Sequence, residues 1–122
     1  MLVLYTYSGC DSCRKALSWL DSRGIVYENK AIRETPPRIE ELKRMLAAYD
    51  GNLRKLFNVS GRDYRALGMK DRLPRMSADE SLELLAGNGN LIKRPFALDG
   101  DEGRVGFKEA DWEEWLAPRG GE

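Results

Sequence analysis

The hydrophobic and polar positions at the start of the chain follow first a strand pattern and then a helix pattern. The apolar run Met1–Tyr7 breaks at a Ser-Gly pair, which predicts a strand followed by a turn. Apolar residues then recur at helical spacing, at Ala16 and Leu20, until Gly24 ends the helix. The run Ile25–Tyr27 follows as a second predicted strand. We therefore expect a βαβ unit, in which the strands are parallel and the helix packs on one face.

The middle of the chain has the pattern of several short helices. Helical spacing resumes after two prolines, at Ile39, Leu42, Leu46 and Tyr49. A short amphipathic turn around Leu56 comes next, and Ser60 is expected to cap a helix that carries Tyr64 and ends at Gly68. The segment Ser77–Glu80 predicts a capping box at the start of a further helix. We expect these helices to form an insertion over about residues 34–89.

Strand character returns in the last third of the chain. The run Leu91–Leu98 predicts a third strand, and Arg104–Phe107 predicts its hairpin partner across a turn at residues 99–103. A final helix carries Trp112 and Trp115, which we expect to pack in the core rather than to bind a ligand. The patterns together predict an α/β fold in a single domain, residues 1–122. Its core would span about 1–33 and 90–118, with the all-helical insertion between the second and third strands.

The composition is that of one globular domain without a strong overall charge. The chain has 122 residues, of which 42% are apolar, enough for a hydrophobic core. Its 20 basic and 20 acidic residues cancel, so no overall field attracts it to nucleic acid or an anionic membrane. No apolar stretch has membrane-spanning length, and Met1 leads straight into a strand without a targeting segment. We therefore expect a soluble, cytoplasmic protein with no direct contact to nucleic acid or membrane.

The chemistry of the chain is concentrated in a Cys-x-x-Cys pair, Cys10 and Cys13, at the predicted start of the first helix. A thiol there meets unpaired backbone N–H groups and the positive end of the macrodipole, both of which favour an anion. Strand, turn, Cys-x-x-Cys and helix in this order predict a thioredoxin-type redox site. We expect Cys10 to be the exposed nucleophile and Cys13 the resolving thiol. Arg14 and Lys15 in the first turn form either a solvated helix face or cationic support for a thiolate or an anionic substrate.

Two other uses of the cysteine pair fit the sequence less well. A zinc site needs about four ligands, and the chain has no histidine and only two cysteines, so carboxylates would have to supply the rest. A structural disulfide would close too small a loop to remove much chain entropy. We therefore expect no bound metal or cofactor.

Pro95 interrupts the third predicted strand. Proline cannot donate to a sheet ladder, so it requires an edge, a bulge or a special turn. In thioredoxin-like folds the third strand begins at a cis-proline that faces the redox cysteines. Arg94, just before it, would then direct its guanidinium at the thiols and stabilise a thiolate or hold an oxyanion. The alternative is a surface arginine at a strand end.

Several motifs together resemble the ArsC/Spx family over nearly the whole chain. They are Tyr-Ser-Gly-Cys10-Asp-Ser-Cys13, Leu-Phe-Asn58-Val-Ser-Gly, Leu-Ile-Lys-Arg94-Pro95 and Val-Gly-Phe107. The resemblance implies a thioredoxin-like fold with a helical insertion, with Cys10 as nucleophile and Arg94 as its partner. Family members include glutaredoxin-coupled arsenate reductases and Spx-type regulators that bind the RNA polymerase α-subunit.

Departures from the family pattern bear on the choice among these functions. The arsenate reductases surround the oxyanion with three arginines, and two of those positions fall at Asn58 and Phe107 here. We therefore expect a poor arsenate reductase. Cys13 is the second cysteine of Spx-type and dithiol relatives. The first hypothesis is a thiol-disulfide oxidoreductase, acting on a protein or small-molecule thiol or disulfide and reduced by glutathione/glutaredoxin or thioredoxin. The alternative is an Spx-like redox-sensing regulator that binds the RNA polymerase α-subunit.

Overall fold

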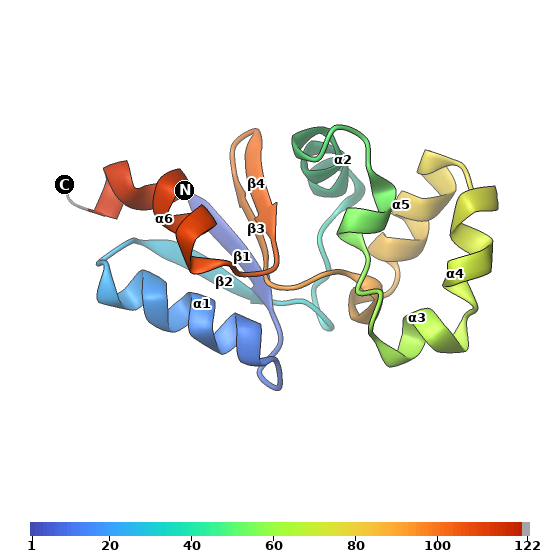
Figure 1. Ribbon diagram of the computed structural model, residues 1–122, viewed down its shortest axis with the longest axis horizontal. Coiled ribbons are helices and arrows are strands. Elements are labelled where there is room, and N and C mark those ends of the chain that lie inside the picture. Colours follow the sequence, from blue (N-terminus) through green and yellow to red (C-terminus); the bar gives the residue numbers. More distant parts are fainter. Residues whose placement is uncertain (121–122) are drawn as a thin grey trace.

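A four-stranded mixed sheet with the strand order β2-β1-β3-β4 forms the centre of the fold (Figure 1). The computed structural model describes residues 1–120, with side chains up to Leu116. The strands are β1 (Leu2–Thr6), β2 (Tyr27–Ala31), β3 (Phe96–Asp99) and β4 (Glu102–Val105). β1 and β2 are parallel, as the βαβ pattern predicted, whereas β3 is antiparallel to both β1 and β4. The expected α/β fold class is confirmed.

The two faces of the sheet are covered by different helices (Figure 1). α1 (Asp11–Ser22) and α6 (Glu109–Gly120) carry the side chains of one core cluster, and α2 (Ile39–Ala48) carries side chains of the other. Side chains alternate along β1, so Leu2 and Leu4 lie in the first cluster and Tyr5 in the second. Trp112 is completely buried in the first cluster, so its expected packing role is confirmed.

The helical insertion continues from α2 and lies beside the sheet (Figure 1). Its remaining helices are η1 (Leu53–Leu56), α3 (Arg62–Ala66), α4 (Met69–Arg72), η2 (Leu73–Arg75), α5 (Ala78–Ala86) and η3 (Gly89–Leu91). The capping box is present as predicted, because Ser77 accepts from the Glu80 N–H and Glu80 accepts from the Ser77 N–H. The prediction for Ser60 is wrong, since Gly61 is the N-cap of α3. None of the helices in residues 1–120 is long and apolar enough to cross a membrane.

The second strand begins later than the apolar run predicted, at Tyr27 instead of Ile25. The Ile25 N–H donates to the Leu20 carbonyl at 3.1 Å, while Gly24 has a φ of 67°. These are the features of a Schellman motif, in which an apolar residue just beyond the glycine packs back on the helix. Ile25 is apolar because it packs at the end of α1. The hydrophobic pattern alone cannot distinguish such a residue from the first residue of a strand.

The third and fourth strands are also displaced from their predicted ranges. Leu91 ends η3, and the next residues pair with the insertion: Ile92 forms an isolated bridge with Phe57, and the Lys93 N–H donates to the Leu56 carbonyl at 2.8 Å. β3 therefore begins only at Phe96. β4 runs over Glu102–Val105 and ends before Phe107, because its register is fixed by a tighter turn than predicted.

A buried polar pair joins the sheet to the insertion. The Tyr5 hydroxyl donates to Glu41 Oε1 at 2.8 Å, and the Arg38 backbone N–H donates to the same oxygen at 3.0 Å. Glu41 is only 5% exposed, so these bonds replace water that its carboxylate has lost. The pair fixes the first turn of α2 to the central strand.

Candidate redox site

Cys10 lies at the N-terminus of α1, directly after the turn that follows β1. It is the N-cap residue, and its Sγ accepts a hydrogen bond from the Cys13 backbone N–H at 3.3 Å. The Cys10 N–H itself donates to the Tyr7 carbonyl at 3.1 Å, which fixes the turn. The side chain is half-buried. Cys10 is thus a partly accessible thiol at the helix N-terminus, with a backbone N–H directed at its sulfur.

Cys13 has the opposite environment, since its side chain is only 1% exposed beneath the first turn of α1. Burial raises the pKa of the Cys13 thiol to about 12, and the hydrogen bond to Cys10 and the charge of Cys10 act in the same direction. The Tyr7 backbone and the positive charge of Arg94 oppose this rise. Cys13 is therefore protonated at neutral pH and shielded from bulky reagents, as a resolving thiol would be.

Arg94 and Pro95 come directly before β3, which pairs with β1 on the side opposite to β2. The Arg94–Pro95 peptide bond is cis, Pro95 is buried, and β3 starts at the next residue, where Phe96 pairs with Tyr5. The guanidinium carbon of Arg94 lies 5.2 Å from the centre of the Tyr7 ring. Within residues 1–120, no hydrogen bond joins Arg94 to either sulfur, so its influence on the Cys13 thiol is through its charge.

The two other basic residues proposed at the site have different surroundings. Arg14 donates to the Ser8 carbonyl at 2.8 Å and forms an ion pair with Asp11. These contacts brace the turn that carries Cys10. Lys15 is exposed on α1. A direct role of either side chain in supporting a thiolate stays a prediction.

The structure adds two arginines that the sequence analysis did not identify. A cavity of about 500 Å³, here called the arginine cavity, lies next to the turn at residues 7–10 that carries Cys10, here called the redox turn. Its lining residues are Tyr7, Arg33, Asn58, Gly61, Arg62, Asp63, Asn90 and Arg94. The Arg33 guanidinium stacks on the Tyr7 ring at 3.7 Å. The position of Arg33 could have been predicted from the sequence. It follows β2 as the cysteines follow β1, and the carboxyl ends of parallel strands meet at one edge of a sheet. Arg62 gave no signal, since the packing of the insertion places it.

Asn58 and Phe107, where the arsenate reductases have arginines, lie in separate places. Asn58 lines the arginine cavity, and its N–H donates to the Leu91 carbonyl at 2.7 Å. Phe107 belongs to an aromatic cluster, with its ring centre 5.1 Å from that of Trp112. Phe107 therefore contributes to the core between α1 and α6 and offers no group to an anion.

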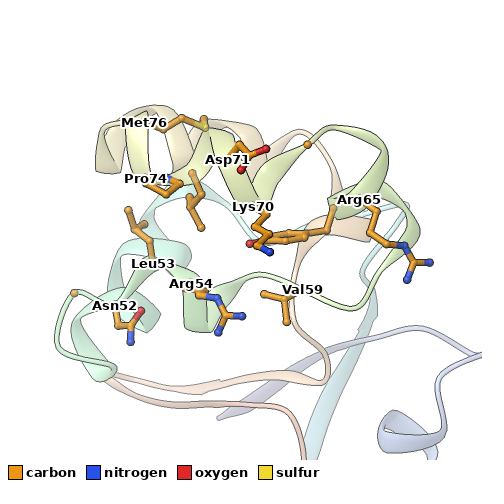
Figure 2. Close-up of a pocket in the computed structure, with 13 residues that line it drawn as sticks. Asn52, Leu53, Arg54, Val59, Arg65, Lys70, Asp71, Pro74 and Met76 are labelled. Carbon is orange, nitrogen blue, oxygen red and sulfur yellow. The ribbon is translucent and has the colours of Figure 1, made fainter.

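A second, larger cavity of about 970 Å³ lies within the helical insertion. Figure 2 shows Leu53, Pro74 and Met76 on one side of it, with Arg54 and Lys70 nearer its middle. Its lining thus combines an apolar wall with Arg54, Arg65 and Lys70, against one acid, Asp71. Neither cysteine lines it, so it is separate from the redox turn.

Comparison with known proteins places these features in context. A sequence model of the ArsC family matches residues 5–115. The chain is 48% identical over 113 residues to the uncharacterized protein YusI of Bacillus subtilis, covering 93% of this chain and 96% of that protein. It is 34% identical over 117 residues to the global transcriptional regulator Spx of Enterococcus faecalis, covering 95% of this chain and 86% of that protein. A possible arsenate reductase from Streptococcus mutans has a similar structure, with a TM-score of 0.85 and 37% identity, covering 93% of this chain and 98% of that one.

Proposed function

Because the chain belongs to the ArsC family, we propose that it acts as a thiol-disulfide oxidoreductase built on the Cys10/Cys13 pair. The observation that carries the proposal is the unequal placement of the two thiols. Cys10 is half-buried at the helix N-cap and its sulfur already accepts a backbone N–H, whereas Cys13 is buried. This is the arrangement of an attacking and a resolving thiol.

The proposed reaction has two exchange steps. The Cys10 thiolate attacks one sulfur of a disulfide R–S–S–R, a Cys10–S–R bond forms, and R–S⁻ leaves and takes up a proton. Cys13 then loses its proton and attacks Cys10 Sγ, which forms the Cys10–Cys13 disulfide and releases the second R–S⁻. Two electrons pass from the protein dithiol to the substrate. An external thiol system, glutathione with glutaredoxin or thioredoxin, returns them.

The environment of Cys13 suits the order of these steps. Two of the causes that raise the pKa of Cys13 are its hydrogen bond to Cys10 and the charge of Cys10. Both end once Cys10 is bound in the mixed disulfide, while the positive charge of Arg94 remains and lowers the pKa of Cys13. Cys13 would thus become easier to deprotonate when it is needed.

A trapping experiment with bis(2-hydroxyethyl) disulfide tests the proposal. Cys13→Ser should accumulate the mixed disulfide on Cys10, detected as an added mass. The parent protein should instead form the internal disulfide, and Cys10→Ser should form neither. With thioredoxin, thioredoxin reductase and NADPH, only the parent protein should sustain turnover. Absence of an adduct on Cys13→Ser, or an adduct on Cys10→Ser, would contradict the proposal.

The second candidate function is that of an Spx-like regulator, in which the same disulfide controls binding to the RNA polymerase α-subunit. It is favoured by the similarity to Spx of Enterococcus faecalis and by the insertion cavity. Arg54, Lys70 and an apolar wall would suit a partner surface that is both acidic and apolar (Figure 2).

Capture of purified RNA polymerase by the immobilised protein, reduced or oxidised, tests this second function. Binding should depend on the redox state and should be lost in Lys70→Glu. Lys43→Glu, an exposed change on α2 that lies outside the cavity lining, is the matched control. No capture in either state would exclude the regulator function for this chain.

A further inference from the structure

We propose that the cavity formed by Arg33, Arg62 and Arg94 binds the carboxylate end of a small amino-acid or peptide disulfide whose sulfur reacts with Cys10. The inference rests on the proposed oxidoreductase function and adds a substrate class to it. The cavity is a site of its own, because neither cysteine is part of its lining.

The charge of the cavity favours an anion. Its three arginines come from three separate segments, the exit of β2, the start of α3 and the residue before Pro95. Within residues 1–120, none of the three forms an ion pair with a carboxylate. One acid, Asp63, lines the cavity, and its Oδ2 accepts a hydrogen bond from Asn88. The lining therefore carries excess positive charge that the protein leaves unneutralised.

Two buried polar atoms of the cavity lack partners, one donor and one acceptor. Arg94 Nη1 and Asn90 Oδ1 are both inaccessible to solvent and unbonded. Buried polar groups are normally hydrogen-bonded, so an unpartnered pair indicates what a ligand would supply. A carboxylate would accept from Arg94, and an ammonium or amide N–H next to it would donate to Asn90. That combination is the end of an amino acid or peptide.

Tyr7 connects the cavity to the reacting sulfur. The guanidinium groups of Arg33 and Arg94 both lie over its ring, and its backbone carbonyl accepts a hydrogen bond from the Cys10 N–H. The charge of Arg94 also acts on Cys13. A disulfide at Cys10 with its charged end over Tyr7 would therefore contact both the arginines and the thiol. The arginines would act as positioning residues, and the exchange steps would be those given above.

Rates of mixed-disulfide formation on Cys13→Ser test the inference. The probes are dithiodipropionate, bis(2-hydroxyethyl) disulfide and cystamine, which are anionic, neutral and cationic, together with oxidised glutathione. We expect the anionic disulfide and oxidised glutathione to react faster than the neutral one, and cystamine to react slowest. Arg33→Ala and Arg62→Ala should each lower the ratio of anionic to neutral rates by about five- to tenfold, because each removes a charge partly screened by water. Arg75→Ala, an exposed change on η2 that lies outside the lining, should keep the ratio.

A binding measurement keeps the site testable apart from the reaction. S-methylglutathione carries the carboxylates and the amine but no exchangeable sulfur. It should protect Cys10 from the neutral reagent iodoacetamide, and Arg33→Ala or Arg62→Ala should weaken that protection. Equal rates with all disulfides, or no protection, would overturn the site. Charge-dependent protection without any disulfide exchange would support the site and overturn the oxidoreductase function.

Discussion

At the scale of single residues, the two cysteines should differ sharply in reactivity. Cys13 is buried and its pKa is raised to about 12, so it should not react with iodoacetamide at neutral or mildly acidic pH. Cys10→Ser should therefore abolish alkylation in this range, and Cys13→Ser should leave most of it. Mass spectrometry of the alkylated peptides distinguishes the sites. Loss of reactivity in Cys13→Ser, with retention in Cys10→Ser, would reverse the assignment of roles.

Arg94 should tune the Cys13 thiol without a hydrogen bond to its sulfur. Its charge lowers the pKa of Cys13, so Arg94→Ala should raise that pKa and slow the resolving step at neutral pH. The measurement is the rate at which the internal disulfide closes from the mixed disulfide on Cys10, followed by mass spectrometry. Arg94→Lys should close it at an intermediate rate, since it keeps the charge but not the planar guanidinium. An unchanged rate in Arg94→Ala would show that the charge of Arg94 does not act on the resolving step.

At the scale of elements, the sequence predicted the helices and strands that local patterns determine, and it missed the element boundaries that tertiary contacts determine. The β1–α1 unit and the capping box at Ser77 follow from patterns within a few residues. The pattern predicts a strand at Ile25 because a Schellman motif and a strand both favour an apolar residue at this position. Leu91 and Ile92 follow a strand pattern, but Leu91 ends η3 and Ile92 forms a bridge with Phe57 of the insertion. The sequence predicts Cys10, Cys13 and Arg94 as site residues, and their roles stay predictions, whereas the position of Arg62 depends on how the insertion packs.

The contact between α2 and β1 should make stability depend on pH in the acid range. Burial alone would raise the pKa of Glu41, but hydrogen bonds from Arg38 and Tyr5 and the charge of Arg38 outweigh it, so the pKa is lowered. A lowered folded pKa contributes stability above the unfolded value of about 4.3, and this contribution is lost as the pH falls through the folded pKa. Glu41→Gln should reduce the free energy of unfolding at neutral pH by about 1–3 kcal/mol.

Urea unfolding at several pH values measures this effect. The difference between the parent protein and Glu41→Gln should be constant near neutral pH and shrink below about pH 4.3. Glu40→Gln, an exposed neighbour in the same turn, should show little difference at any pH. A difference between parent and Glu41→Gln that did not change with pH would show that the ionised carboxylate is not the stabilising form.

At the scale of the whole molecule, the midpoint potential of the Cys10/Cys13 couple separates the two candidate functions. A reductant of small disulfides should have a potential between about −270 and −200 mV, the range of thioredoxin and the glutaredoxins. We expect a value in this range, because burial of Cys13 disfavours its thiolate and so limits stabilisation of the reduced form. Equilibration with glutathione buffers measures it. A markedly more oxidising value would favour the redox-sensing regulator.

The whole site also predicts poor reduction of arsenate, although a similar structure belongs to a possible arsenate reductase. An arsenate attacked by Cys10 must lie at that sulfur, whereas Arg33 and Arg62 line a cavity that includes neither cysteine, so we expect them to hold the far end of a longer disulfide and not an arsenate. Asn58 has no charge, and Phe107 is fixed against Trp112 at 5.1 Å between ring centres, so Arg94 alone would face the oxyanion. If each missing arginine contact is worth about 1.5 kcal/mol, losing two weakens arsenate binding by about a hundredfold.

Production of arsenite with glutathione and glutaredoxin is the assay, with reduction of bis(2-hydroxyethyl) disulfide as the control. Rapid turnover at micromolar arsenate would refute this expectation. It would mean that a single arginine and the helix N-terminus are enough to form an anion site at Cys10.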